Sequence, residues 1–116
     1  MMRSNPKPLR LLLVDDQEID LRALETAFRE VSADLDVTSL NNGQGATERI
    51  LHDRIDLVLL DINMPRVNGF DVITAVRAKM PGKRPAFIML SSSKDTSDMT
   101  RAYDAGVLSY LVKPDN

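Results

Sequence analysis

The stretch Leu57-Val58-Leu59-Leu60-Asp61-Ile62-Asn63-Met64-Pro65 decides the fold, because four consecutive apolar residues stop at one acid. A run of this length and composition is typical of a strand buried on both faces of a parallel sheet. Other short apolar runs stop in the same way: 11–14 at Asp15-Asp16, 87–90 at Ser91, and 110–112 at Lys113. Ligands bind in the crevice outside the carboxyl ends of such strands, so these polar stops together predict a site.

Helical periodicity separates the strands. Apolar residues at three- and four-residue steps predict a helix over 17–35, with one stripe facing inward: Leu21, Leu24, Phe28, Val31 and Leu35. A weaker strand over 37–40 and the turn Asn41-Asn42-Gly43 lead to a short helix around Ala46 and Ile50. Two further helices bury Val72, Ile73, Val76 and Met80, and Met99, Ala102 and Tyr103. The alternation predicts an α/β protein, a doubly wound five-stranded parallel sheet with helices on both faces.

The pattern holds five strands but only four helices. A parallel sheet needs both faces covered, so the absent last helix leaves one face guarded mainly by the 17–35 helix. We therefore expect either a trimmed chain or another element over that face. Residues 1–8, which are polar and contain two prolines, are predicted to form a flexible N-terminal arm, and residues 9–116 a single domain.

Composition argues against several classes of function. Fifteen basic and seventeen acidic side chains give a formal net charge of −2, so no basic surface for nucleic acid or anionic membrane is expected. The absence of cysteine excludes disulfides and thiolate metal sites, and one histidine cannot form a histidine cluster. No segment approaches the ~20 apolar residues of a membrane span. These features favour a cytoplasmic protein.

The carboxylates of Asp15, Asp16 and Asp61 are expected to converge if their strands are neighbours. At ~5 Å and an effective dielectric constant near 20, each pair repels by roughly 3 kcal/mol, so a cation or a proton must relieve the repulsion. Oxygen ligands without histidine or cysteine favour a hard ion, Mg²⁺ before Ca²⁺. The alternative is that Asp15 and Asp16 cap the helix that begins near Gln17.

Asp61 is the candidate nucleophile, because a carboxylate beside Mg²⁺ can attack phosphorus and form an aspartyl phosphate. Ser91 would supply a hydroxyl donor, and Lys113 a positive charge for a carboxylate at rest and a phosphoryl oxygen afterwards. Each residue also has a purely structural explanation: an aspartate bonded to its own turn, a loop serine, and a lysine at a strand end. Their joint appearance at successive strand ends favours phosphoryl chemistry.

With these residues in place, the chain resembles the receiver domain of two-component response regulators, from about Leu9 to Asn116. The resemblance is carried by four motifs: Leu-Val-Asp15-Asp16; Leu-Leu-Asp61-Ile-Asn-Met64-Pro65 with Asn68-Gly69; Met-Leu-Ser91-Ser; and Tyr110-Leu-Val-Lys113-Pro114. It implies the flavodoxin-like strand order 2-1-3-4-5, which is known for this family. The loops also resemble those of single-domain regulators paired with phytochrome-type kinases. Family members continue into a fifth helix that this sequence lacks.

The resemblance implies a role for each site residue. Asp61 would accept the phosphoryl group and, with Asp16 and the backbone carbonyl of Asn63, bind Mg²⁺ directly, while Asp15 would bind the ion through water. Ser91 and Lys113 would contact phosphoryl oxygens. Further implied features are a switch at Ser91 and Tyr110 that alters the face formed by the fourth helix and fifth strand, phosphate-lifetime tuning by Asn63 and Ser93, and a cis bond before Pro114.

The resulting hypothesis is a signalling module that accepts phosphate on Asp61 from a sensor histidine kinase or phosphotransfer protein and turns over no external substrate. Its downstream partner protein is not identified by the sequence, and both monomer and homodimer remain open. One alternative is a small aspartate-nucleophile Mg²⁺ phosphatase of the haloacid-dehalogenase kind, although Asn63 stands where such enzymes need a second acid. Another is a receiver-like adaptor that binds partners without phosphorylation.

Overall fold

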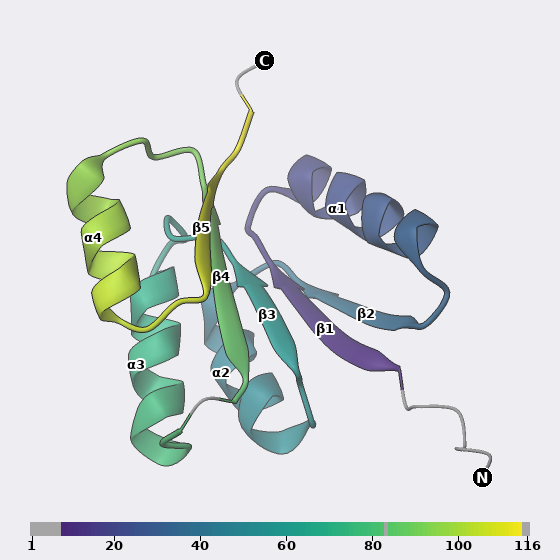
Figure 1. The fold of residues 1–116 in the computed structure, drawn as a ribbon, viewed down its shortest axis with the longest axis horizontal. Helices are drawn as coiled ribbons and strands as arrows, with labels where there is room; N and C mark the ends of the chain where they lie inside the picture. Colours follow the sequence, from purple (N-terminus) through teal and green to yellow (C-terminus); the bar gives the residue numbers. More distant parts are fainter. Residues whose placement is uncertain (1–7, 83, 115–116) are drawn as a thin grey trace, which may run out of the picture.

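Strands and helices alternate along the chain in a computed structural model that describes residues 8–82 and 84–114. The elements are β1 (Leu9–Val14), α1 (Glu18–Val31), β2 (Leu35–Leu40), α2 (Gly43–His52), β3 (Leu57–Leu60), α3 (Gly69–Lys79), β4 (Ala86–Ser91), α4 (Thr96–Asp104) and β5 (Ser109–Val112). The strands pair in parallel in the order β2-β1-β3-β4-β5 (Figure 1). The predicted doubly wound, flavodoxin-like fold is therefore confirmed.

The sheet divides the core into two clusters. Alternate strand residues point to opposite faces, so Leu12 and Val58 pack on one side while Leu11 and Leu59 pack on the other. The first side carries the larger cluster, which buries residues of α2, α3 and α4. The second side is covered by α1 alone among the described helices (Figure 1). Most of the buried apolar volume therefore lies between the sheet and three helices.

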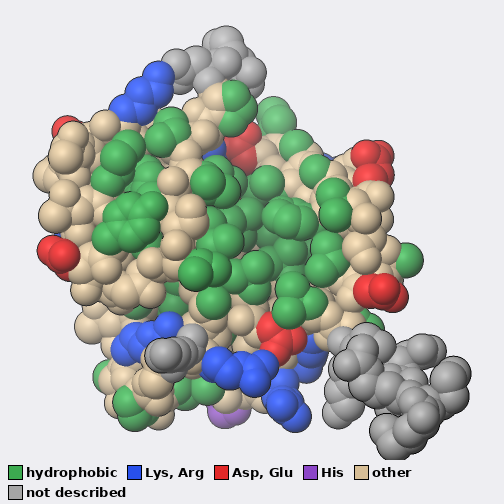
Figure 2. All heavy atoms as spheres, viewed as in Figure 1, with side chains coloured by type: hydrophobic (Ala, Val, Ile, Leu, Met, Phe, Trp, Pro, Cys, Tyr) green, Lys and Arg blue, Asp and Glu red, His purple; other side chains and the backbone are tan. Residues whose placement is uncertain are grey.

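Hydrophobic side chains remain open to solvent on the α1 side of the sheet. Figure 2 shows them gathered between α1 and β5. A cavity of 510 Å³ lies there, and Ala23, Leu24 and Ala27 of α1 face Leu90 and Pro114 across it. The expectation that α1 would guard this face largely by itself is met within the described residues. We name this feature the α1 groove.

The first helix is shorter than the sequence predicted. It ends at Val31, whose side chain is 77% exposed, whereas the periodicity extended the helix and its buried stripe to Leu35. The hydroxyl of Ser32 accepts the N–H of Asp34, and this local turn diverts the backbone into β2. Leu35 instead pairs with Leu9 of β1, so it is a strand residue and does not belong to the helical stripe.

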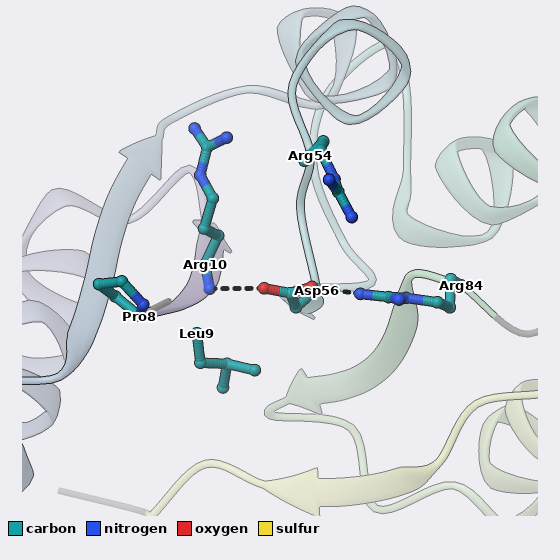
Figure 3. Close-up of a pocket in the computed structure, with 6 residues that line it drawn as sticks. All are labelled: Pro8, Leu9, Arg10, Arg54, Asp56 and Arg84. Atoms are coloured by element: carbon teal, nitrogen blue, oxygen red, sulfur yellow. Dashed lines mark hydrogen bonds and ion pairs between the residues drawn. The ribbon is translucent and has the colours of Figure 1, made fainter. Parts of the chain in front are cut away.

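An ion pair closes the end of the sheet opposite the polar strand stops. Asp56 accepts the backbone N–H of Arg10 at 2.9 Å and pairs with the Arg84 guanidinium (Figure 3). These contacts tie the start of β1 to the segment before β4. A 430 Å³ cavity beside them is lined by Arg54 as well, and Figure 3 shows all three arginines around Asp56.

Two sequence expectations concern residues at the edge of what the structure describes. The predicted arm, residues 1–8, lies outside the described residues except for Pro8, so its flexibility stays a prediction. Within the described residues, no helix has both the length and the apolar character needed to cross a membrane.

Candidate functional site

Three carboxylates meet at the carboxyl ends of β1 and β3. One oxygen from each of Asp15, Asp16 and Asp61 lies within 4.8 Å of the others. Asp15 is 2% exposed and Asp61 6% exposed, whereas Asp16 is half-buried. The sheet ladder continues into this cluster, because the N–H of Asp61 donates to the carbonyl of Val14 at 2.9 Å. The sequence expectation that the three acids converge is therefore met.

The start of α3 fixes the backbone of Asp61. The N–H of Gly69 donates to the carbonyl of Ile62, and a β-carbon at Gly69 would lie 2.5 Å from the carbonyl oxygen of Asp61. Asn68 and Asp71 form a reciprocal capping box that sets the direction of the helix. The Asn68-Gly69 turn seen in the sequence thus allows α3 to approach the acid cluster closely.

Burial raises the pKa of Asp61 to about 6 from an ordinary value of 3.8. The positive charge of Lys113 opposes this shift, and the negative charges of Asp15 and Asp16 add to it. A hydrogen bond from the backbone of Asn63 lowers the pKa again. Lys113 alone therefore does not fully compensate the negative charge of the three carboxylates.

The oxygen ligands of this cluster suit a divalent cation. Within the described part of the chain, Oδ1 of Asp16 is buried and has no hydrogen-bond partner. An orphaned carboxylate oxygen next to two further carboxylates is a strong acceptor without a donor, and buried oxygens of this kind are normally satisfied. A ligand set made only of carboxylate oxygens suits hard ions such as Mg²⁺. We identify Asp15, Asp16 and Asp61 as a candidate metal centre.

Helix capping does not account for the acid pair. The N-cap of α1 is Gln17, and its side chain makes no capping hydrogen bond within the described residues. Oδ1 of Asp15 accepts the N–H of Gln17 at 2.9 Å, which closes the turn between β1 and α1. The capping alternative therefore explains one oxygen of Asp15 and none of Asp16.

Lys113 is the cation of the site. Its ammonium lies 2.7 Å from Asp15, 2.9 Å from Asp20 and 3.6 Å from Asp61. Burial lowers the pKa of Lys113, but hydrogen bonds to Asp15 and Asp20 and the charge of Asp61 outweigh it and raise the pKa above its ordinary value. Lys113 therefore stays charged.

Sequence reasoning missed Asp20. Its side chain comes from the first turn of α1 and reaches Lys113 across 93 residues of sequence. Asp20 precedes Leu24 by four residues, so it lies on the helix face that carries the apolar stripe. An acidic residue on the apolar face of the predicted helix was the sequence signal that could have identified Asp20.

Ser91 is fully buried at the end of β4 and begins a chain of hydrogen bonds. Its hydroxyl accepts the N–H of Ser93, and the Ser93 carbonyl accepts the phenol of the buried Tyr110 at 2.9 Å. The Ser93 hydroxyl donates to Asp98 of α4 at 2.6 Å. Ser91 and Tyr110, which the family resemblance implies as switch residues, are thus joined through one loop residue.

Asn63 is exposed and follows Asp61 by two residues, and its implied roles as a carbonyl ligand and in phosphate lifetime stay predictions. The cis bond expected before Pro114 is wrong: among the described residues the cis peptide bond lies at Arg84–Pro85. The N–H of Lys113 donates to the carbonyl of Ser91 and extends the β4–β5 ladder by one hydrogen bond. The backbone therefore stays extended up to Pro114.

The family model of the response regulator receiver domain matches residues 11–116. The chain therefore belongs to the receiver domain family of two-component signal transduction, in which phosphorylation is the shared hallmark. Its relatives include the transcriptional regulatory protein PrrA of Mycobacterium tuberculosis, 36% identical over 90% of this chain. The gliding motility regulatory protein of Myxococcus xanthus is 36% identical over 92% of it. The chain spans 43% of the first relative and 14% of the second.

Solved structures match the whole fold. The phosphorylated cyanobacterial phytochrome response regulator RcpA is 27% identical, with a TM-score of 0.82 over 94% of this chain and 83% of that one. The receiver domain of the sensor histidine kinase PA1611 from Pseudomonas aeruginosa is also 27% identical, with a TM-score of 0.80 over 94% and 88%. In that protein a magnesium ion is coordinated in the active-site cleft.

Proposed function

We propose that Asp61 is the phosphoacceptor of this receiver domain and that a sensor histidine kinase or phosphotransfer protein supplies the phosphoryl group. The observation that carries the proposal is the convergence of three carboxylates, of which Asp61 is buried, beside one ammonium. No other titratable cluster of this composition occurs among the described residues.

The side chains around Asp61 would divide the work. Asp15 and Asp16, with Asp61 and the backbone carbonyl of Asn63, would hold Mg²⁺, which supplies charge neutralisation for the transferred oxygens when bound. Lys113 would pair with a phosphoryl oxygen once Asp61 is modified. Ser91 would donate its hydroxyl to another, and Asn63 and Ser93 would tune the access of water and hence the phosphate lifetime.

Phosphorylation would be transmitted through the β4–α4 loop. The Ser91 hydroxyl accepts the N–H of Ser93 and would donate its own proton to a phosphoryl oxygen, so a shift of Ser91 toward the phosphoryl group would pull on Ser93. Ser93 is hydrogen-bonded in turn to Tyr110 and Asp98. The exposed face of α4 and β5, which includes Tyr103 and Val112, would be remodelled for a partner protein. A shift from mostly one state to mostly the other needs about 5.5 kcal/mol of differential interaction.

The proposed setting is a cytoplasmic signalling pathway, with the domain modified by a separate kinase and turning over no external substrate. The similarity to RcpA, a cyanobacterial phytochrome response regulator, supports a photoreceptor kinase as one class of donor to test. The output is a partner protein, and binding by monomer or homodimer is to be decided by measuring mass with and without phosphorylation.

The deciding experiment supplies Mg²⁺ and acetyl phosphate without any kinase. We expect a mass increase of one phosphoryl group on the peptide that contains Asp61, and loss of that increase in Asp61→Asn. Asp53→Asn is the matched control, because Asp53 lies outside the cluster and pairs with Arg49. A mass increase that persists in Asp61→Asn would contradict the assignment.

The same preparation separates the alternative functions. Steady release of phosphate from small phosphomonoesters, dependent on Asp61, would favour a phosphatase. Unchanged partner affinity in Asp61→Asn would favour a phosphorylation-independent adaptor. If the chain is a receiver, we expect at most one equivalent of hydroxylamine-labile phosphate per chain and no sustained turnover of phosphomonoesters.

A further inference from the structure

The side chain of Asp20 pairs with Lys113, which also lies near Asp61. The ammonium lies 0.7 Å closer to the nearest oxygen of Asp20 than to that of Asp61, at 2.9 Å against 3.6 Å. The side chain of Asp20 is 42% exposed, whereas that of Asp61 is only 7% exposed. Asp15, at 2.7 Å, is nearer still to Lys113 but belongs to the candidate metal centre, so Asp20 is the close partner of Lys113 that lies outside that centre.

The position of Asp20 is fixed by its helix. The next residue, Leu21, is buried in the core beneath α1, and Leu24 packs against the same cluster one turn later. Because α1 is anchored in this way, the Asp20 carboxylate cannot follow Lys113 toward Asp61. Any movement of the ammonium toward a group on Asp61 therefore weakens its pairing with Asp20.

Asp15 does not replace Asp20 in this role. Its carboxylate belongs to the candidate metal centre, so a bound cation would compete with Lys113 for that carboxylate. Asp20 is then the acid left to neutralise the lysine. A lysine is a compact charge whose attraction for a second anion falls when a first anion is already close.

We propose that Asp20 is a positioning residue that competes with the phosphoryl group for Lys113 and so favours the unphosphorylated state. This inference rests on the proposed function of Lys113 as a phosphoryl contact. It assigns to α1 a control over phosphoryl affinity that is separate from metal binding and from the β4–α4 loop.

The test measures the binding of beryllofluoride, a phosphoryl mimic, at saturating Mg²⁺ by calorimetry and by ¹⁹F NMR of the bound anion. We expect Asp20→Asn to lower the Kd about three- to tenfold, within the range that a half-exposed ion pair can supply. Glu18→Gln is the matched control, since it removes the same charge from the first turn of α1 and Glu18 bonds only to Asn41 among the described residues. The control should leave the Kd unchanged.

A double-mutant cycle shows whether Asp20 acts through Lys113. In a Lys113→Met background, Asp20→Asn should no longer tighten beryllofluoride binding, because the charge for which it competes is gone. An equal Kd for wild type and Asp20→Asn, an equal gain in Glu18→Gln, or a gain that survives in Lys113→Met would each overturn the proposal. Failure of the wild type to bind beryllofluoride would instead overturn the proposed function.

Discussion

A β-carbon on Gly69 would lie 2.5 Å from the main-chain carbonyl oxygen of Asp61, closer than nonbonded atoms approach. The first residue of α3 is therefore pressed against the backbone that carries the candidate phosphoacceptor. The same β-carbon would lie 3.1 Å from the α-carbon of Ile62, so it would collide with the peptide unit that joins Asp61 to Ile62.

Substitution of this glycine should loosen the site. Backbone cannot move aside as a side-chain tip can, so we expect Gly69→Ala to lower the free energy of unfolding by about 1–3 kcal/mol. Urea denaturation gives the measurement. Gly45→Ala is the control, because its β-carbon would meet the nearest atom at 3.4 Å, and no loss of stability is expected there. Equal losses in the two variants would contradict the close-packing argument.

Removal of the Asp61 charge should stabilise the metal-free fold at neutral pH. The folded-state pKa of about 6 lies above the ordinary 3.8, so the folded chain binds the proton more tightly than the unfolded chain does. Stability from this group is present below pH 4 and is lost as the pH rises through 6. We expect Asp61→Asn to gain about 1–3 kcal/mol over wild type at pH 7, and little at pH 4, in EDTA.

Asp56→Asn should show the opposite pH dependence. The backbone N–H of Arg10 lowers the pKa of Asp56 most, desolvation opposes this, and Arg84 lowers it further. The stability from Asp56 is therefore present above its ordinary pKa of 3.8 and is lost as the pH falls through the lowered value. Melting curves from pH 3 to 7 should show this variant below wild type at neutral pH and converging with it in acid.

Magnesium should stabilise the chain through Asp16. A ligand that binds only the folded state adds about 2.7 kcal/mol at 100 times its Kd, which raises the melting temperature by several degrees. We expect this rise in wild type and its loss in Asp16→Asn, whose amide cannot replace the orphaned carboxylate oxygen. Asp53→Asn should retain the full rise. A magnesium response in Asp16→Asn equal to that of wild type would exclude Asp16 as a ligand.

The phenol of Tyr110 should restrain the loop after β4. Tyr110→Phe removes the bond to the Ser93 carbonyl, and we expect a loss of about 0.5–1.5 kcal/mol together with faster amide exchange over residues 91–95. Tyr103→Phe removes an exposed phenol that accepts the N–H of Tyr110, and it should leave exchange in that loop unchanged. Hydrogen exchange with mass spectrometry distinguishes the two.

Much of the candidate site could be predicted from the sequence, because the end of a buried strand is marked by the point at which an apolar run stops. Each apolar run stops at the residue that the site uses, and parallel strands bring their carboxyl ends to one edge of the sheet. Asp15, Asp16, Asp61, Ser91 and Lys113 all follow from that rule. The end of α1 was wrong because Leu35 continues a helical period by coincidence, and only pairing with Leu9 reveals it as a strand residue.

By itself, the sequence determined the order of strands and helices and the chemical identity of the groups at the strand ends, because both depend on local periodicity and residue type. The tertiary structure decided which groups touch. It placed Asp20 beside Lys113, joined Ser91 to Tyr110 through Ser93, and left one oxygen of Asp16 without a partner. Such contacts join residues far apart in sequence, and they depend on the packing of α1 and α4 against the sheet, which local patterns do not encode.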